Sequence, residues 1–516
     1  MPTADLIFKN ANVITVDSKQ PVAEFVAVKD EKILFIGSKD RLNEFSAPGT
    51  RIIDCEGQTL VPGFNDAHCH IFSFVRKLTG IDLGSPEIKS IDDIKAVIKK
   101  KAENTPPGQW ISGTDYNEFY LAEKRHPTRW EIDEVAPNHP VVLSHRSLHG
   151  CVLNSRALAL AGITAEAPEP PGAMIGRRVE DGELNGFLVE MLGYIREKVM
   201  PPISAEELDK NIRLASAQYL SHGLTSLQDA TFVNDFKRWQ YYQHFKEQGL
   251  LKSRVYMMTG VEKVQEFQKV GLSFGSGDKH LRLGAVKIIP SLVSGRLYPS
   301  QVELNEMVLD AHRAGFQVAC HAVQVGLLDA VIRTYEYLRE SSPDFGVRRH
   351  RIEHCGECTP KMVQSIKRLQ LTVITHPSYA YYNGDRYLAT VSSDIIPFLY
   401  PLRSLVDSGI VMAGASDSPV APNNPLMGIY GAITRLTSSG RKMEQKESIT
   451  ALQALALYTI NAAYASHEEK TKGSITLGKL ADMVLLSDDP TKVSPGTIKE
   501  IKVRMAVIGG KVAWEA

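Results

Sequence analysis

Apolar and polar residues alternate in short runs near both ends of the chain. The runs "DLIFKNANVITVD" and "FVAVKDEKILFIGS" lie near the start, and "GSITLGKLADMVLLS" and "VRMAVIGGKVAWEA" lie near the end, with Gly, Asp or Asn between them. A period of two residues is typical of strands with one buried face. Because hairpins this short cannot bury a core alone, we predict one composite β-sandwich domain from residues 1–60 and 474–516.

A different pattern fills the middle of the chain, where short Val- and Ile-rich runs alternate with longer amphipathic stretches. This alternation indicates repeated strand–helix units around a parallel sheet. The strand candidates are "TLVPGFNDAHCH", "LTSLQDA" (224–230), "SRVYMMTG" (253–260), "LRLGAVKII" (281–289), "FQVACHA" (316–322), "RHRIEHC" (349–355), "LTVITHP" (371–377) and "GIVMAGASD" (409–417). Eight such units form a (β/α)8 TIM barrel of the α/β class, which we assign to residues 61–79 and 211–473.

The first and second strand candidates are separated by far more residues than the loops that usually join such units. The intervening sequence has apolar runs of its own, such as "HPVVLSHRS" and "VLNSRALALAGI". We therefore expect an inserted subdomain over the barrel mouth at residues 80–210.

Composition narrows the class of protein. Lys plus Arg and Asp plus Glu number 59 each among 516 residues, so there is no basic field for nucleic acid or an anionic membrane. The N-terminus does not resemble a signal peptide, and no apolar run approaches the length of a spanning helix. Six cysteines are no disulfide framework, which favours the cytoplasm. We expect a small-molecule substrate, and a homodimer is left open.

The strand candidates end in polar residues that can bind metal or move protons. These are His68, His70, Asp229, Lys287, His321, His354, His376 and Asp417. Barrel active sites are assembled at the carboxyl ends of the strands, so these side chains should converge on one cavity. His68 and His70 are two residues apart and share a strand face, where they would form a bidentate clamp.

Each of these signals has an ordinary structural alternative. A single strand-end histidine can be a hydrogen-bonded structural residue, and Asp417 could cap the following helix. Lys287 is the most informative, because a buried ammonium is costly without a partner. Its structural alternative is an ion pair with Asp229 or Asp417. Chance is much less able to explain the whole set of strand-end polar residues, in the order of the strands, than any one of these residues.

The combination resembles the metal-dependent amidohydrolase superfamily, and within it the amidohydrolase family 3 branch, which includes N-substituted formamide deformylases. The resemblance covers nearly the whole chain. It rests on "NANVITVD", "LVPGFNDAHCH", "HPTRWEIDEVAPNHPVVL", "LNSRALALAGI", "GAVKI", "VACHAV", "RIEHC", "GASDSP" and "GSITLGKLADMVLLSDDP". It implies one or two divalent metal ions, most simply Zn²⁺.

The family pattern also implies roles for particular residues. His68 and His70 would bind the more buried metal, and a carboxylated Lys287 would bridge two metals. His321 and His354 would hold the second metal. Asp417 would complete the site. The sequence departs from the branch after Lys287, in "KIIPSLVSGRLYPS", and after His321, in "HAVQVG", which affects substrate identity more than metal binding.

The chemistry implied is hydrolysis of a carbon–nitrogen bond in a non-peptide amide or formamide. A metal ion lowers the pKa of bound water to about 7, which supplies hydroxide as the nucleophile and polarises the carbonyl. Asp417 would act as general base and acid. We also assign His354 and His376 to catalysis. His376 would stabilise the oxyanion, although it could equally be a structural residue before Pro377.

Aromatic and basic residues in loops are candidates for substrate contacts: Trp110, Tyr116, His149, Arg296 and Tyr379. Ordinary packing is the alternative for each aromatic ring. Cys355 and Cys358 form a lone Cys-x-x-Cys pair to which we assign no role, and Cys69 should face away from the metal.

Two other functions stay open at this point. The same metal site could serve a deaminase, decarboxylase or isomerase of a cyclic or aromatic substrate, because function lies in the substrate-contacting loops. A non-catalytic metal-binding regulatory protein is the third reading, which is disfavoured because Asp417 is present.

Overall fold

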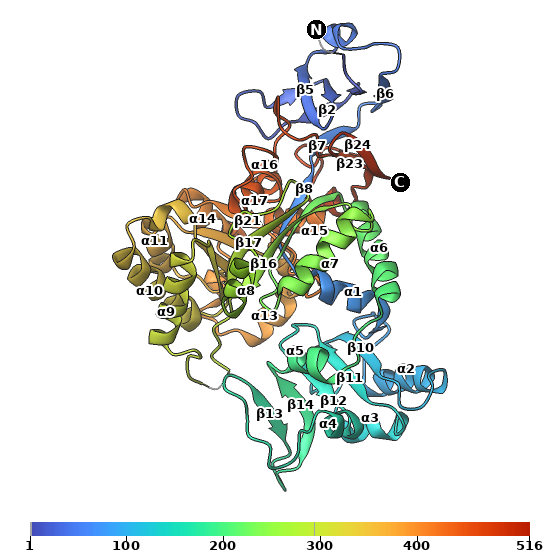
Figure 1. Ribbon diagram of the computed structural model, residues 1–516, viewed down its shortest axis with the longest axis vertical. Coiled ribbons are helices and arrows are strands. Elements are labelled where there is room, and N and C mark those ends of the chain that lie inside the picture. Colours follow the sequence, from blue (N-terminus) through green and yellow to red (C-terminus); the bar gives the residue numbers. More distant parts are fainter. Residues whose placement is uncertain (1–2, 294) are drawn as a thin grey trace. The chain divides into compact units, whose positions relative to one another are not determined.

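The computed structural model describes residues 3–293 and 295–516 (Figure 1). The chain forms two compact units. The first contains residues 1–70, 215–290 and 301–516, and the second contains residues 71–214 and 291–300. In neither unit do the described residues include a helix long and apolar enough to cross a membrane.

Eight parallel strands form the centre of the first unit, as the sequence predicts. They are β8 (Phe64–Cys69), β15 (Leu224–Asp229), β16 (Arg254–Gly260), β17 (Leu281–Ile288), β18 (Val318–Ala322), β19 (Arg351–His354), β20 (Thr372–Thr375) and β21 (Met412–Gly414). They follow one another around the sheet in sequence order, from β8 to β21. Nearly every strand residue is buried, as expected of a parallel sheet covered on both faces.

The seam between β21 and β8 nearly closes this sheet into a barrel. The Asp417 amide donates to the His68 carbonyl over 2.8 Å, and the His70 amide donates to the Ser418 carbonyl over 2.8 Å. The protein is therefore a (β/α)8 TIM barrel, and the residues of the seam lie at the carboxyl ends of its first and last strands.

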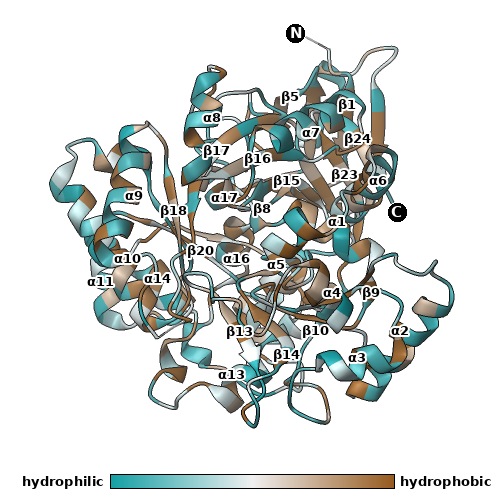
Figure 2. Ribbon diagram, turned by 60° about the horizontal axis from the view of Figure 1, so that its bottom comes forward, coloured by the Kyte–Doolittle hydropathy of each residue, from teal (hydrophilic) through white to brown (hydrophobic). Residues whose placement is uncertain are grey.

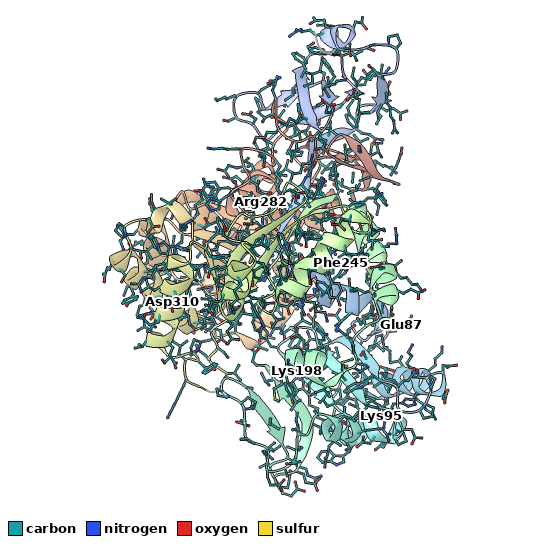
Figure 3. All side chains as sticks on the ribbon, in the orientation of Figure 1. Glu87, Lys95, Lys198, Phe245, Arg282 and Asp310 are labelled. Carbon is teal, nitrogen blue, oxygen red and sulfur yellow. The ribbon has the colours of Figure 1, made fainter. Side chains whose placement is uncertain are left out.

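Helices follow the barrel strands, and Figure 2 shows that they carry both hydrophobic and hydrophilic residues. On α7 Phe245 is fully buried, whereas Asp310 of α9 is exposed (Figure 3). The helices are α6 (Ala205–Ser221), α7 (Phe236–Glu247), α8 (Val264–Lys269), α9 (Gln301–Arg313), α10 (Val325–Ser341), α11 (Pro360–Arg368), α12 (Tyr379–Tyr382), α13 (Gly384–Thr390), α14 (Leu402–Asp407), α15 (Pro425–Thr434), α16 (Ala451–Leu457) and α17 (Ile460–Ala465).

The first unit also contains two smaller sheets, and the second of them combines strands from both ends of the chain. One has the order β5 (Lys32–Gly37), β4 (Phe25–Lys29), β1 (Leu6–Lys9), β6 (Arg51–Asp54). The other has the order β24 (Lys511–Glu515), β23 (Val503–Ile508), β22 (Met483–Leu486), β7 (Thr59–Pro62), β2 (Asn12–Ile14), β3 (Val22–Ala23). Phe8, Val26, Leu60, Met483 and Val507 belong to one buried cluster, so strands from both ends share a core.

The second unit has a mixed sheet with its own core. Its order is β13 (Met174–Arg177), β14 (Leu184–Val189), β12 (Gly150–Leu153), β11 (Val141–His145), β10 (Ile111–Tyr116), β9 (Ile81–Asp82). Its helices are α1 (Ile71–Thr79), α2 (Ile91–Glu103), α3 (Arg129–Val135), α4 (Ser155–Leu160) and α5 (Leu192–Tyr194). The predicted insert, residues 80–210, lies inside this unit, which begins earlier and also takes residues 291–300.

Candidate metal centre

His68, His70 and Asp417 meet at the seam of the barrel. The Asp417 Oδ1 oxygen lies 3.4 Å from Nε2 of His68 and 3.2 Å from Nε2 of His70. His68 is the penultimate residue of β8, His70 follows the strand, and Asp417 follows β21. Asp417 does not cap the next helix, because Asn424 is the N-cap of α15. These three residues offer ligand atoms close enough together for one metal ion.

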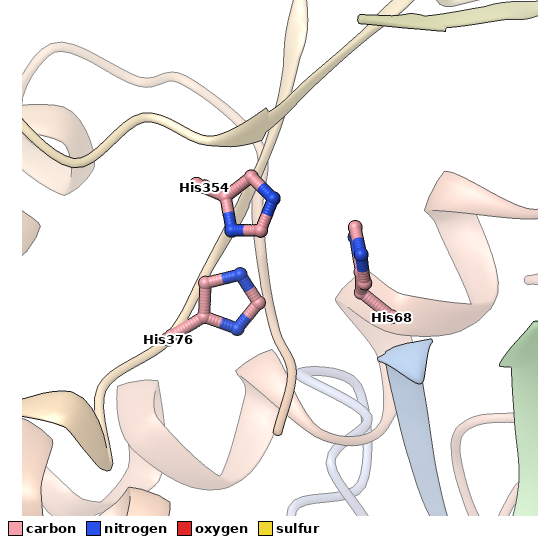
Figure 4. Close-up of side chains that lie close together, drawn as sticks. All are labelled: His68, His354 and His376. Atoms are coloured by element: carbon pink, nitrogen blue, oxygen red, sulfur yellow. The ribbon is translucent and has the colours of Figure 1, made fainter. Parts of the chain in front are cut away.

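A second group shares His68 and adds His354 and His376 (Figure 4). The ring centroid of His68 lies 4.9 Å from that of His354 and 5.5 Å from that of His376, and the last two are 4.6 Å apart. His321, the last predicted histidine ligand, lies beside this group with its ring 4.4 Å from His354. The carboxyl ends of β8, β18, β19 and β20 thus bring four histidines together.

Two residues of the centre have a backbone conformation that few side chains adopt. The φ angle is 71° at His354 and 58° at Asp417. Positive φ at a residue other than glycine costs about 1–3 kcal/mol and occurs where the surrounding structure imposes it. In a regular strand His354 would point opposite to Glu353. At its positive φ angle His354 departs from this regular alternation, and its ring lies beside that of His376.

Glu353 and Arg351 lie against the candidate metal centre, and the sequence pattern did not single them out. A carboxylate oxygen of Glu353 is in hydrogen-bond contact with Nδ1 of His68, and Arg351 donates from Nε to the other oxygen over 2.8 Å. Both side chains are fully buried. Their signal was present in "RIEHC", because two charged residues two positions apart share one face of a buried strand.

The surroundings of Glu353 and His68 determine the pKa values of these two side chains. Burial would raise the pKa of Glu353, but the charge of Arg351 and the hydrogen bond with His68 hold it well below its usual range. Burial, and then the charge of Lys287, lower the pKa of His68 to about 3. His68 is therefore neutral beside an ionised carboxylate. Nδ1 carries its proton, and Nε2 presents a lone pair to Asp417.

Lys287 lies near the end of β17 and is 2% exposed. Among the described residues its Nζ has no hydrogen-bond partner, so the ion pair with Asp229 or Asp417 is not formed. Burial lowers its pKa to about 8, although the charges of Glu353 and Asp417 act in the opposite direction. Asp229 instead accepts a hydrogen bond from the Tyr242 hydroxyl. It belongs to neither group of candidate ligands.

Two side chains fix the position of the Asp417 loop and of β8. The buried Asp66 carboxylate accepts the Ser416 amide over 2.9 Å and also contacts the Ser416 hydroxyl. Burial raises the pKa of Asp66 to about 6. On the other side of the strand, Cys69 is buried with Sγ 3.5 Å from the Gln228 carbonyl, on the face away from the histidines.

Tyr379 lies against the centre rather than at a distance from it. Its hydroxyl donates to Oδ2 of Asp417 over 2.7 Å, and its ring stacks on His376 with centroids 4.8 Å apart. The side chain is 5% exposed. Burial and the charge of Asp417 hold the pKa of Tyr379 well above its usual value, so the phenol is a donor to this carboxylate.

The other predicted substrate contacts belong to the second unit. The Tyr116 ring is fully buried in its core and its hydroxyl contacts His126 over 3.1 Å, while Trp110 packs against another cluster of the same unit. Nδ1 of His149 lies 2.7 Å from a Glu190 oxygen, and Arg296 belongs to the segment 291–300. The buried Tyr116 ring packs in the core of the second unit, which is the alternative to a substrate contact.

Comparison with known proteins identifies the family and the fold. The amidohydrolase family matches residues 51–513. The N-substituted formamide deformylase of Arthrobacter pascens is 30% identical to this chain over 538 residues, covering 99% of this chain and 98% of the relative. A metal-dependent hydrolase of Pyrococcus horikoshii has a TM-score of 0.74 at 21% identity, covering 95% of this chain and 99% of that one. One from Pyrococcus furiosus has a TM-score of 0.71 at 23% identity, covering 94% and 100%.

Proposed function

Because this chain belongs to the amidohydrolase family and is a hydrolytic enzyme, we propose that it hydrolyses the carbon–nitrogen bond of a small non-peptide amide, with N-substituted formamides as the first substrates to consider. The full-length similarity to a formamide deformylase supports this substrate class. The observation that carries the proposal is the convergence of His68, His70 and Asp417 at the end of the barrel where such enzymes build their sites.

The donor atoms fit a divalent metal ion. Nε2 of His68 is a lone-pair acceptor, because Nδ1 is committed to Glu353, and it faces the carboxylate oxygen of Asp417 across 3.4 Å. Two acceptors at this distance repel each other unless a cation lies between them. Imidazole nitrogen and carboxylate oxygen are the ligands that Zn²⁺ accepts in catalytic sites. His68, His70 and Asp417 would therefore hold one ion.

A second ion has candidate ligands on the neighbouring strands. The His354 ring lies 4.9 Å from the His68 ring and 4.4 Å from the His321 ring, and Lys287 is buried with a nitrogen that no described residue satisfies. Addition of carbon dioxide to the neutral Lys287 amine, with loss of a proton, would give a carbamate anion, so that an unsatisfied group would become a ligand for a cation. We include this modification in the proposal because it accounts for an amine placed without a partner among metal-ligand residues.

The residues of the chain supply the proton transfer. When bound, the ion lowers the pKa of a water molecule and polarises the amide carbonyl. Burial would raise the pKa of Asp417, but the neighbouring imidazoles of His70, His68 and His376 hold it below its usual range, so it is ionised at neutral pH and can accept a proton. Asp417 then delivers this proton to the leaving nitrogen, which departs as an amine.

One experiment separates this function from the alternatives. Purified protein is analysed for bound metal and assayed on N-formyl, N-acyl and cyclic amides and on heterocyclic amines, with Asp417→Asn as the inactive control. Amide hydrolysis that is lost on chelation and restored by Zn²⁺ supports the proposal. Release of ammonia from heterocyclic amines alone would instead favour a deaminase. Bound metal without turnover on any substrate would favour the regulatory protein.

A further inference from the structure

His376 has its two ring nitrogens in different surroundings. Nδ1 lies 3.3 Å from the Ala415 carbonyl oxygen, which can only accept a hydrogen bond. In the neutral ring Nδ1 therefore carries the proton and Nε2 presents a lone pair. This Nε2 is buried and has no hydrogen-bond partner among the described residues.

The lone pair of His376 decides between two roles. Stabilisation of an oxyanion needs an N–H group directed at the substrate, and in this tautomer Nε2 has none. Ligation of a metal needs a lone pair, and His376 offers a ring nitrogen within 4.8 Å of ligand nitrogens of His68 and His354. The hydrogen bonds of the Nδ1 atoms leave Nε2 of His68 and Nε2 of His376 with a lone pair each, which is what ligation of a cation requires.

Tyr379 contacts one residue of each group of candidate ligands, His376 in one and Asp417 in the other. Its ring stacks on His376 at an interplanar angle of 24°. Its hydroxyl donates to Oδ2 of Asp417, whereas Nε2 of His68 and Nε2 of His70 lie near Oδ1. The ring is itself held by Tyr400, whose centroid lies 5.9 Å away in an edge-to-face contact. The Tyr379 side chain therefore orients one residue of each group, His376 and Asp417.

From these contacts we propose that His376 is a metal ligand through Nε2, and that Tyr379 is a positioning residue that aligns His376 and Asp417 at the metal centre. The proposal deepens the function proposed above and rests on it for the presence of metal. It replaces the oxyanion role that the sequence suggested for His376. It also assigns Tyr379 to the metal centre instead of the substrate.

The ligand role is tested with His376→Asn, which is smaller and offers no imidazole nitrogen. We expect Zn²⁺ to bind at least tenfold more weakly, and the visible absorption spectrum of the Co²⁺-loaded protein to change, because a nitrogen ligand is lost. His350→Asn is the matched control, since His350 is a buried histidine bonded to His312 and to the Val318 amide instead of the centre. Wild-type affinity and an unchanged Co²⁺ spectrum in His376→Asn would overturn the assignment, even if activity fell.

The positioning role is tested with Tyr379→Phe, which keeps the stacked ring and removes the hydroxyl. Loss of an outer partner of a metal ligand typically costs about 10–100-fold in metal affinity or activity, and we expect this loss in Zn²⁺ affinity and kcat with little change in KM. Tyr387→Phe removes a hydroxyl from the same aromatic cluster without touching Asp417. Equal Zn²⁺ affinity and kcat in the two variants, or a change confined to KM, would refute the positioning role.

The two proposals can fail independently. A protein that binds Zn²⁺ through His376 but hydrolyses no amide would contradict the proposed function and support this inference. An active amide hydrolase whose Zn²⁺ affinity and Co²⁺ spectrum do not depend on His376 would do the reverse. Circular dichroism and thermal unfolding of each variant show whether a loss of metal reflects a loss of fold.

Discussion

Nδ1 of His68 contacts a Glu353 carboxylate oxygen, and both side chains are at most 1% exposed. Glu353 is held in turn by Arg351, which also donates to Gln228 over 2.6 Å and to the Ala67 carbonyl over 2.8 Å. This chain of contacts fixes which His68 nitrogen is free to bind metal. It also anchors the ligand to the interior of the barrel.

We expect Glu353→Gln to weaken both the metal site and the fold. The amide lacks the charge that pairs with Arg351 and fixes the His68 tautomer, so Zn²⁺ affinity should fall about 10–100-fold. A buried arginine left without its partner typically costs about 3–5 kcal/mol. Metal titration and urea unfolding measure the two effects. Glu336→Gln, which removes an exposed carboxylate paired with Arg368, should change neither, and a Glu353→Gln protein that matched it would contradict this role.

Lys287→Met should reduce metal binding and activity without destabilising the metal-free protein. Removing a buried amine that has no partner removes a desolvation cost, so the urea midpoint of the metal-free variant should equal or exceed that of the wild type. Lys472→Met is the contrast, because the Lys472 ammonium is buried but paired with Glu468 and bonded to Ser226. The idea fails if Lys287→Met lowers the midpoint as much as Lys472→Met does.

The stability of the barrel should fall on acidification because of His350. Burial, and then the nearby His312, lower the His350 pKa to about 3, whereas an unfolded histidine titrates near 6.5. Below about pH 6.5 the unfolded chain binds a proton that the folded chain excludes, so stability decreases as pH falls toward 3. Between pH 7 and pH 5 this amounts to roughly 2 kcal/mol. Urea unfolding should show this loss in the wild type and a smaller loss in His350→Gln; equal losses would exclude His350 as the source.

Asp482 joins the barrel to the small sheet that contains β22. It forms a buried bidentate ion pair with Arg254 of β16, with distances of 2.7 and 2.9 Å, and accepts the Gly509 amide over 2.8 Å. Asp482→Asn should cost about 3–5 kcal/mol, because Arg254 stays buried without a counter-charge. The double variant Arg254→Met/Asp482→Leu should recover part of the loss. Unfolding monitored by circular dichroism checks both, and a double variant less stable than Asp482→Asn would argue against this account.

The sequence predicts the barrel well because its strands are short, apolar and followed by helices. All eight predicted strands are present, although β21 is shorter than the run "GIVMAGASD" from which it was predicted. The segment 291–300 was not predicted to belong with the insert. Its grouping depends on contacts between residues far apart in the chain, such as the approach of Tyr298 to Gly172, and periodicity carries no information about such contacts.

The candidate site was predictable only in part. Strand-end histidines are visible in a pattern, and His68, His70, His321 and His354 do lie together. Glu353 was missed because its partner is on a strand 285 residues earlier in the chain. The surroundings of His376 depend on the Ala415 carbonyl and on the stacked Tyr379 ring, which no local pattern reveals.

The seam between the first and last barrel strands has a consequence for biosynthesis. His68 and His70 leave the ribosome early, but Asp417 emerges only after the seven later strands have been made, and β22, with the Asp482 that bonds to β16, follows later still. A nascent chain therefore has no complete binding site for the ion until most of its length has been translated. Formation of the site of His68, His70 and Asp417 therefore comes late in synthesis, and a chain truncated before residue 417 should lack this site.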